Sequence, residues 1–293
     1  PPSPAPSPTD IIGYALSHPE ECSYTREDDK ATTLHQALLY QHPYEVIISI
    51  ARSCQPLIGA ANNEGNIPLH EAVYHHASVD TIRFLIDQHP ATIAAEQEGN
   101  DQPLTHGGLK AANKWGWLPL HYACGHGKQT LEVVLIIYHL YPEGCLFPDK
   151  NGLVPLHWAV QNQTAETIME LVSQDNKQAA CDDNQGGFPL HHFFHHSVKA
   201  QENEDAVSAV LRAYPDARFV RDAEGKLPYD YAKICEVPQA ILSLLDPAIS
   251  DYEFQTASGS WETYPPTINQ AISEALALDY NPATFGTKMG GKT

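Results

Sequence analysis

The densest group of potential metal ligands in the sequence is the run His191-His192-Phe193-Phe194-His195-His196. On a helix, His192 and His196 would lie one turn apart, which is the spacing of a two-histidine metal site. Zinc needs a third or fourth ligand, and no residue spacing in the sequence indicates one. The sequence therefore predicts no metal site and no cofactor, and Phe193 and Phe194 are expected in the core.

No other set of residues has the spacing of a known catalytic motif. The sequence contains no Gly-x-Ser-x-Gly, no glycine-rich phosphate loop, no His-Glu-x-x-His and no paired cysteines of the kind that bind zinc. Its 6 cysteines are too widely spaced for a disulfide scaffold and are expected to be reduced thiols. We therefore predict a protein that is not an enzyme.

The charge of the chain limits the partners that it can bind. Lysine and arginine number 17 against 36 aspartate and glutamate residues, which gives a formal net charge of −19. Nucleic acids and anionic membranes are bound through cations, so both are disfavoured as partners. The longest apolar stretch, residues 133–138, is far shorter than a membrane span. Residues 1–30 contain no apolar block of a secretory signal, so we expect an intracellular protein, cytoplasmic or nuclear.

A short motif that ends in Pro-Leu-His recurs through the middle of the chain and organises it. In each unit, a glycine permits the positive φ of a tight turn, a proline suits the first position of a helix, and two apolar helical runs follow. Successive copies are 34 to 39 residues apart, except for one interval of 51. The sequence therefore predicts pairs of short helices that stack to form a continuous core. The motif occurs at residues 65–70, 116–121, 152–157 and 187–191, with weaker copies at 32–35 and 225–230.

This motif resembles the Thr-Pro-Leu-His-x-Ala signature of the ankyrin repeat family, over about residues 31–246. The resemblance implies a mainly α-helical solenoid of about six helix–turn–helix repeats with hairpin fingers. Apolar residues such as Ile67 replace the signature threonine, so a capping hydroxyl is lost. The long interval is interpreted as an inserted loop at about 99–114. The resemblance also implies that the motif histidines bond the backbone of their own and neighbouring repeats; these are His35, His70, His121, His157 and His191.

The two ends of the chain differ from the repeats. Residues 1–30 form a proline-rich, acidic arm that is predicted to be flexible. Residues 250–293 are predicted to form a strand, a turn, a strand and an amphipathic helix, the helix at about 264–275. They resemble the first half of a WWE domain, a small α+β module. That resemblance implies binding of ADP-ribose units and occurrence in ubiquitin-ligase proteins, but Tyr252 replaces the first tryptophan and the segment lacks the arginine that a pyrophosphate needs.

In an ankyrin stack, the residue after each motif histidine and those three to four positions later face the concave side. Several of these are aromatic residues or histidines, which are favoured at interface hot spots. We expect Tyr122 and Trp158 to lie side by side with partly exposed rings, flanked by Tyr74 and His192. The predicted partner-binding residues are Tyr40, Glu71, Tyr74, His75, Tyr122, His126, Trp158, Gln161, Asn162, His192, His195 and His196.

The sequence thus predicts a monomeric, non-enzymatic interaction scaffold that binds a protein partner through the concave ankyrin surface. Its acidic charge favours a partner with a basic segment. Two alternatives stay open. One is a substrate-recognition part of a ubiquitin-ligase or ADP-ribose-dependent system, suggested by the WWE-like segment. The weaker one is a histidine-dependent metal or pH-responsive binder.

Overall fold

The computed structural model describes residues 17–18, 25, 28–89, 107–126, 129–195, 204–247, 253–255 and 261–263. The chain divides into two compact units, Pro1–Leu171 and Val172–Thr293. Most of the proline-rich arm lies outside the described residues, as does the end of the chain after residue 263. None of the helices in the described ranges is long and apolar enough to cross a membrane.

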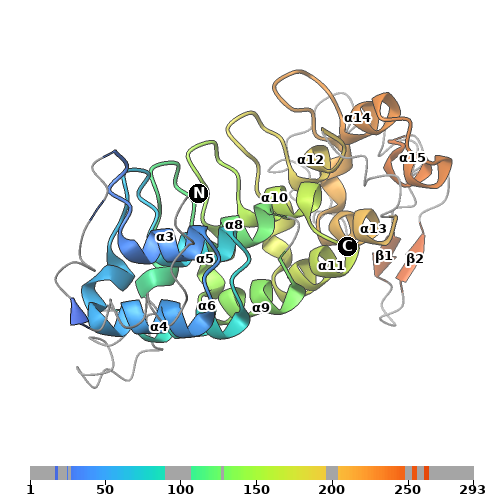
Figure 1. The fold of residues 1–293 in the computed structure, drawn as a ribbon. Coiled ribbons are helices and arrows are strands. Elements are labelled where there is room, and N and C mark those ends of the chain that lie inside the picture. The colour runs from blue at the N-terminus through green and yellow to red at the C-terminus, as the bar shows by residue number, and fades with distance from the viewer. Residues whose placement is uncertain are drawn as a thin grey trace, which may run out of the picture. The chain divides into compact units, whose positions relative to one another are not determined.

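The first unit is a stack of helix pairs (Figure 1). The first helices of the pairs form one row, in which each contacts the next: α3 (Thr33–Leu39), α5 (Pro68–Tyr74), α8 (Pro119–Gly125) and α10 (Pro155–Asn162). The second helices form a second row: α4 (Tyr44–Ser53), α6 (Val79–Asp87) and α9 (Leu131–Leu140), with α11 (Ala165–Gln174) following α10. Short 3-10 helices precede the turns: η1 (Gln55–Gly59), η2 (Gly107–Lys110) and η3 (Pro142–Leu146). The predicted stacking of short helix pairs is thus confirmed for these residues.

The second unit continues the alternation of first and second helices along the chain. Its helices are η4 (Asn176–Ala180), α12 (Pro189–His195), α13 (Glu204–Ala213), η6 (Pro215–Phe219), α14 (Pro228–Ile234) and α15 (Gln239–Leu245). Strands β1 (Glu253–Gln255) and β2 (Trp261–Thr263) pair antiparallel, with Phe254 opposite Glu262. This strand pair agrees with the sequence expectation, but the predicted helix after it lies outside the described residues. A strand pair alone does not establish the WWE-like module.

A repeated turn positions the start of each first helix. Before α8, Asn113 Oδ1 accepts hydrogen bonds from the backbone N–H groups of Trp115 and Trp117, both at 2.9 Å. Gly116 between them has a φ of 83°, in the left-handed region that favours glycine. Side-chain bonds of this kind stabilise turns without help from neighbouring elements. The same bonds recur in the turns that begin at Asn62, Asp149, Asp183 and Asp222.

The motif histidines close the N-terminus of the first helices. Nδ1 of His121 accepts a hydrogen bond from the N–H of Leu118 at 3.0 Å, so the ring proton is on Nε2, which donates to the carbonyl of Leu153 at 3.2 Å. The imidazole therefore bonds the N–H of the N-cap residue and links two repeats. It does not replace the bond that a threonine hydroxyl makes to the histidine N–H, as Thr32 does to His35 at 3.4 Å. Burial lowers the pKa of His70 and of His121 to about 4. His35, His70 and His191 make the same pair of bonds, which confirms their predicted structural role.

The inserted loop ends earlier than the sequence suggested. Lys114 N–H donates to the carbonyl of Glu64 at 2.9 Å, just as Lys150 N–H donates to that of Trp115 in the next pair of turns. Together with η2, these bonds place residues 107–114 in the regular repeat rather than in an insertion at 99–114. The extra residues of the long interval therefore lie before η2, outside the described residues.

In the later motif copy at 187–191, the turn glycine is Gly186, with a φ of 70°, and not Gly187.

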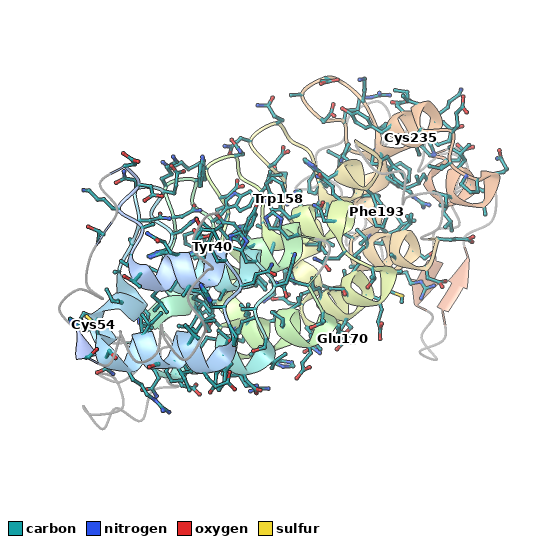
Figure 2. All side chains as sticks on the ribbon, viewed as in Figure 1. Tyr40, Cys54, Trp158, Glu170, Phe193 and Cys235 are labelled. Carbon is teal, nitrogen blue, oxygen red and sulfur yellow. The ribbon has the colours of Figure 1, made fainter. Side chains whose placement is uncertain are left out.

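The core lies between the two rows of helices and is mostly aliphatic. In α12, Phe193 and Phe194 are both 0% exposed, which confirms that they are core residues. Figure 2 labels Phe193 on this helix. The described cysteines are free thiols: Cys54, Cys124, Cys145, Cys181 and Cys235. Outside this core, the turns and the first helices form the surface described next.

Candidate aromatic binding pocket

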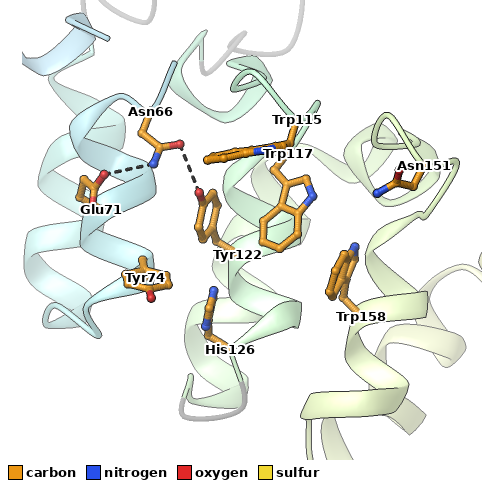
Figure 3. A pocket seen from close by; sticks show the side chains of 9 residues that line it. All are labelled: Asn66, Glu71, Tyr74, Trp115, Trp117, Tyr122, His126, Asn151 and Trp158. Atoms are coloured by element: carbon orange, nitrogen blue, oxygen red, sulfur yellow. Dashed lines mark hydrogen bonds between the residues drawn. The ribbon is translucent and has the colours of Figure 1, made fainter. Parts of the chain in front are cut away.

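An open pocket of about 420 Å³ lies in the first unit, where the turns meet the first helices α5, α8 and α10. Figure 3 shows that its side chains come from three successive repeats and from the turns between them. Most of the lining is aromatic, and one side chain is acidic. The lining residues are Asn66, Glu71, Tyr74, Trp115, Trp117, Tyr122, His126, Asn151 and Trp158.

The aromatic rings meet one another at steep angles. Trp117 lies between Tyr122 and Trp158, with ring centroids 5.0 and 4.6 Å away and interplanar angles of 73° and 62°. Tyr74 lies 5.8 Å from Tyr122 at 90°. Such edge-to-face contacts are favourable and fix the rings relative to one another. The rings therefore form walls of a preformed pocket, and Tyr74 and Trp115 remain 41% and 44% exposed at its mouth.

Tyr122 is part of the interior, which corrects the expectation of a partly exposed ring. Its side chain is only 6% exposed. Its hydroxyl donates to Asn66 Oδ1 at 3.2 Å and accepts from Asn113 Nδ2 at 3.1 Å. The expected contact between Tyr122 and Trp158 is also altered, because the indole of Trp117 lies between them. Tyr122 thus forms a fixed wall of the pocket rather than a free contact surface.

Glu71 gives one side of the pocket a negative charge. Its Oε1 accepts hydrogen bonds from Asn66 Nδ2 at 3.1 Å and Asn62 Nδ2 at 3.3 Å, and its Oε2 lies 3.4 Å from His75 Nε2. These neighbours hold the carboxylate in place. On the same side, burial lowers the pKa of His126, so its imidazole is neutral at pH 7 and adds no positive charge.

The indole nitrogen of Trp158 departs from a pattern that four other repeats follow. In those repeats, the turn Asn or Asp bonds the side chain nine residues later, as in Asn62–Glu71, Asn113–Tyr122, Asp183–His192 and Asp222–Tyr231. In the repeat of Trp158, the corresponding oxygen, Asp149 Oδ2, accepts from Trp117 Nε1 at 3.0 Å. Trp158 Nε1 is buried and has no acceptor among the described residues. Beside the pocket, the interior therefore contains a hydrogen-bond donor with no acceptor in the described part of the chain.

The structure brings together part of the predicted binding set. Glu71, Tyr74, Tyr122, His126 and Trp158 line the pocket. Other predicted residues of this unit are not among its lining. His75 lies beside Glu71, Asn162 Nδ2 donates to the carbonyl of Trp158 at 2.9 Å, Gln161 precedes Asn162 on α10, and Tyr40 caps α3 with 66% of its surface exposed.

The predicted residues of the second unit have a different environment. His192 Nε2 lies 2.7 Å from Asp183 Oδ2, and both residues line a separate pocket of about 340 Å³. Burial of Asp183 opposes its ionisation, but hydrogen bonds from His192 and from the backbone of Gly187 and Gln185 outweigh burial and lower its pKa to about 2.

The side chain of His195 and the whole of His196 lie outside the described part of the chain. Within the described part, no cluster of three or more His, Cys, Asp or Glu side chains could hold a metal ion.

Four lining residues were not predicted, and all lie in the turns: Asn66, Trp115, Trp117 and Asn151. The sequence does contain a signal for two of them. Trp115 and Trp117 flank the turn glycine Gly116, at positions where the other turns have mostly polar residues. Two large aromatic residues at an exposed turn are costly to hydrate, so they indicate a contact surface.

The family model of the ankyrin repeat matches residues 64–96. The match begins at the turn before α5 and includes α5 and α6, so it contains Asn66, Glu71 and Tyr74 of the pocket. Ankyrin repeats generally mediate protein–protein interaction and are typically non-enzymatic. No curated protein matches the chain. The family match supports the ankyrin part of the sequence analysis, and nothing in the comparisons supports the WWE-like module.

Proposed function

We propose that this protein is a protein-binding module whose first unit recognises its partner through the aromatic pocket. The observation that carries the proposal is the convergence of Tyr74, Trp115, Trp117 and Trp158 from successive repeats on one open pocket. Aromatic side chains that are held rigidly lose little entropy on binding, and they dominate the energetics of protein interfaces.

The exposure of these rings supports a contact function over a packing function. Tyr122 is buried and packs against Trp117, whereas Tyr74 and Trp115 are 41% and 44% exposed. Large rings that remain in water cost free energy unless a partner covers them. A partner side chain that enters the pocket would remove this apolar surface from water and contact several rings at once.

The charge of the protein supports a partner with a basic segment. The chain has a formal net charge of −19, and Glu71 gives the pocket itself an acidic side. Complementary charge favours encounter with basic partners and disfavours acidic ones. The concave surface expected from the ankyrin resemblance is thereby narrowed to one proposed position, between α5 and α10.

The test compares proteins captured from the native cell by the wild-type chain and by three single variants. Trp158→Ala and Trp115→Ala remove rings of the pocket, and Tyr40→Ala removes an exposed ring outside it. We expect the partner to be retained by Tyr40→Ala and lost by both tryptophan variants. A hot-spot ring contributes about 2 kcal/mol or more, which is about thirtyfold in affinity.

Purified partner then gives direct dissociation constants for the same variants, with thermal melting as the check on folding. A partner that binds folded Trp158→Ala and Trp115→Ala as tightly as the wild type would place the binding surface elsewhere.

A further inference from the structure

We propose that the aromatic pocket binds a methylated lysine in a peptide segment of the partner. This inference rests on the proposed function, because it names the group that would enter the same pocket. Its elements are ring faces, one carboxylate and one unpaired indole N–H, and each of them selects for part of such a ligand.

The rings select for a cation. Tryptophan and tyrosine carry negative charge on their faces, and several faces around one pocket attract an ammonium group, tryptophan most strongly. The chain already uses this interaction at the mouth of the pocket, since Lys114 Nζ lies 4.4 Å from the centroid of Trp115. Lys114 also pairs with Glu64 and is not among the lining residues, so its charge does not fill the pocket. The carboxylate of Glu71 adds attraction for the same sign of charge.

The hydrogen-bond acceptors of the pocket select for a cation without N–H groups. Glu71 Oε1 already accepts from two asparagine amides, and Oε2 lies beside His75. Asn66 Oδ1 likewise accepts from Asn113 Nδ2 at 2.9 Å and from Tyr122. An unmodified lysine brings three N–H donors and an arginine five, and a desolvated donor needs an acceptor. A trimethylated ammonium carries the charge without donors, so it suits the side of the pocket that Glu71 and Asn66 form, whose acceptors are already engaged.

The indole N–H of Trp158 selects for a peptide over a free small cation. It is buried without an acceptor because Trp117 occupies Asp149 Oδ2. The atom is closed to solvent in this structure, so a ligand acceptor satisfies it only when a small displacement of the neighbouring side chains opens it. A modified lysine within a peptide brings backbone carbonyl groups together with its cation, whereas tetramethylammonium brings none.

The test is a titration of the full chain followed by tryptophan fluorescence, since three of its 4 tryptophans line the pocket. The probe is trimethyllysine with an acetylated amino group and a methylamide at its carboxyl group. The matched probes are unmodified lysine and arginine with the same blocking groups, the neutral analogue in which a tert-butyl group replaces the trimethylammonium group, and tetramethylammonium. We expect the trimethyllysine probe to bind at least about tenfold tighter than each of the others.

Two conservative variants assign the effect to the pocket while retaining its shape. Glu71→Gln removes the charge. It should weaken binding of the trimethyllysine probe severalfold without changing the affinity for the neutral analogue. Trp158→Phe keeps a ring but removes the N–H, and it should reduce the advantage of the blocked trimethyllysine over tetramethylammonium. Met169 is an exposed residue of α11 that does not line the pocket. Met169→Ala should therefore change neither the affinity for the trimethyllysine probe nor its advantage over tetramethylammonium.

Equal binding of the neutral analogue would overturn the proposal by showing a merely apolar pocket. Equal binding of lysine or arginine would show a general cation site, and equal binding of tetramethylammonium a site for small cations. No binding by any probe would also overturn it. If partner capture depends on Trp158 while the trimethyllysine probe does not bind, the proposed function stands and this inference fails.

Discussion

The hydroxyl of Tyr122 connects two repeats through buried polar groups. It bonds Asn66 from the preceding turn and Asn113 from its own turn, and the two asparagines bond each other. Asn66 and Asn113 are themselves buried. Polar atoms in such a network have no water to replace a lost partner, so each deletion costs more than the bond itself. At the scale of the residue, therefore, one wall of the pocket is held by hydrogen bonds.

We expect Tyr122→Phe to lower the free energy of unfolding by about 1–3 kcal/mol, because it leaves buried amide groups with fewer partners. Tyr40→Phe is the matched control, since Tyr40 is 66% exposed and a surface change of this kind costs less than about 0.5 kcal/mol. Urea denaturation followed by circular dichroism measures both. Equal midpoints for Tyr122→Phe and the wild type would show that the hydroxyl network contributes nothing.

At the scale of the element, the turns determine where the pocket side chains lie. Each turn combines a glycine of positive φ with an Asn or Asp that bonds two backbone N–H groups. Adjacent turns also bond each other, as Lys150 N–H does with the carbonyl of Trp115. Trp115 and Trp117 flank one such glycine, so the conformation of a single turn positions both indoles. A change that distorts this turn should therefore affect stability and the pocket together.

Gly116→Ala and Gly225→Ala separate backbone strain from steric clash. Both glycines have a positive φ, which costs an alanine about 1–2 kcal/mol. A Cβ at Gly116 would meet the backbone nitrogen of Lys150 at 3.0 Å, whereas a Cβ at Gly225 would meet no atom of the described residues within 4 Å. We expect Gly116→Ala to be the more destabilising by at least about 1 kcal/mol, as overpacking typically costs 1–3 kcal/mol.

Chemical denaturation of the two variants and the wild type gives this difference directly. The clash argument fails if the two glycine variants lose the same free energy of unfolding. The indole fluorescence of Gly116→Ala in its folded state should also differ from that of the wild type, because the turn carries two of the pocket tryptophans.

At the scale of the whole molecule, the buried motif histidines link stability to pH. Burial lowers the pKa of His70 and His121 to about 4, and it also lowers the pKa of His35 and His191. In the unfolded chain a histidine has a pKa of about 6.5. Below that pH the unfolded state binds protons that the folded state does not, so acid favours unfolding. Each histidine contributes to this loss of stability until the pH reaches its folded pKa.

The free energy of unfolding should therefore be constant above about pH 7 and fall between pH 6.5 and 5, by up to about 1.4 kcal/mol per pH unit for each such histidine. Urea denaturation at constant ionic strength over pH 5 to 8 measures it, and this range avoids the titration of ordinary carboxylates. The His121→Gln variant should be less stable than the wild type at pH 8, but its free energy of unfolding should depend less on pH. A wild-type stability that stays level down to pH 5 would contradict the assignment of neutral, buried imidazoles.

The sequence by itself determined the repeats, most of the turn glycines, the prolines that begin most of the first helices and the buried Phe193 and Phe194. These features depend on residues close together in the chain: a glycine for the turn, a proline at the first helical position and a histidine three residues after the N-cap. It also placed Glu71, Tyr74 and Trp158 on the face that the pocket occupies. Local backbone preferences and periodicity carry this information, because they do not depend on distant partners.

Only the tertiary structure decided which rings are walls and which are open to a ligand. Tyr122 is buried through a bond to Asn66, 56 positions away, and Trp117 bonds Asp149, 32 positions away. The latter bond leaves Trp158 without its expected acceptor. Equivalent positions in the repeat thus have different environments, because neighbouring repeats compete for the same polar atoms. Periodicity cannot show such competition, since it arises only when the repeats stack.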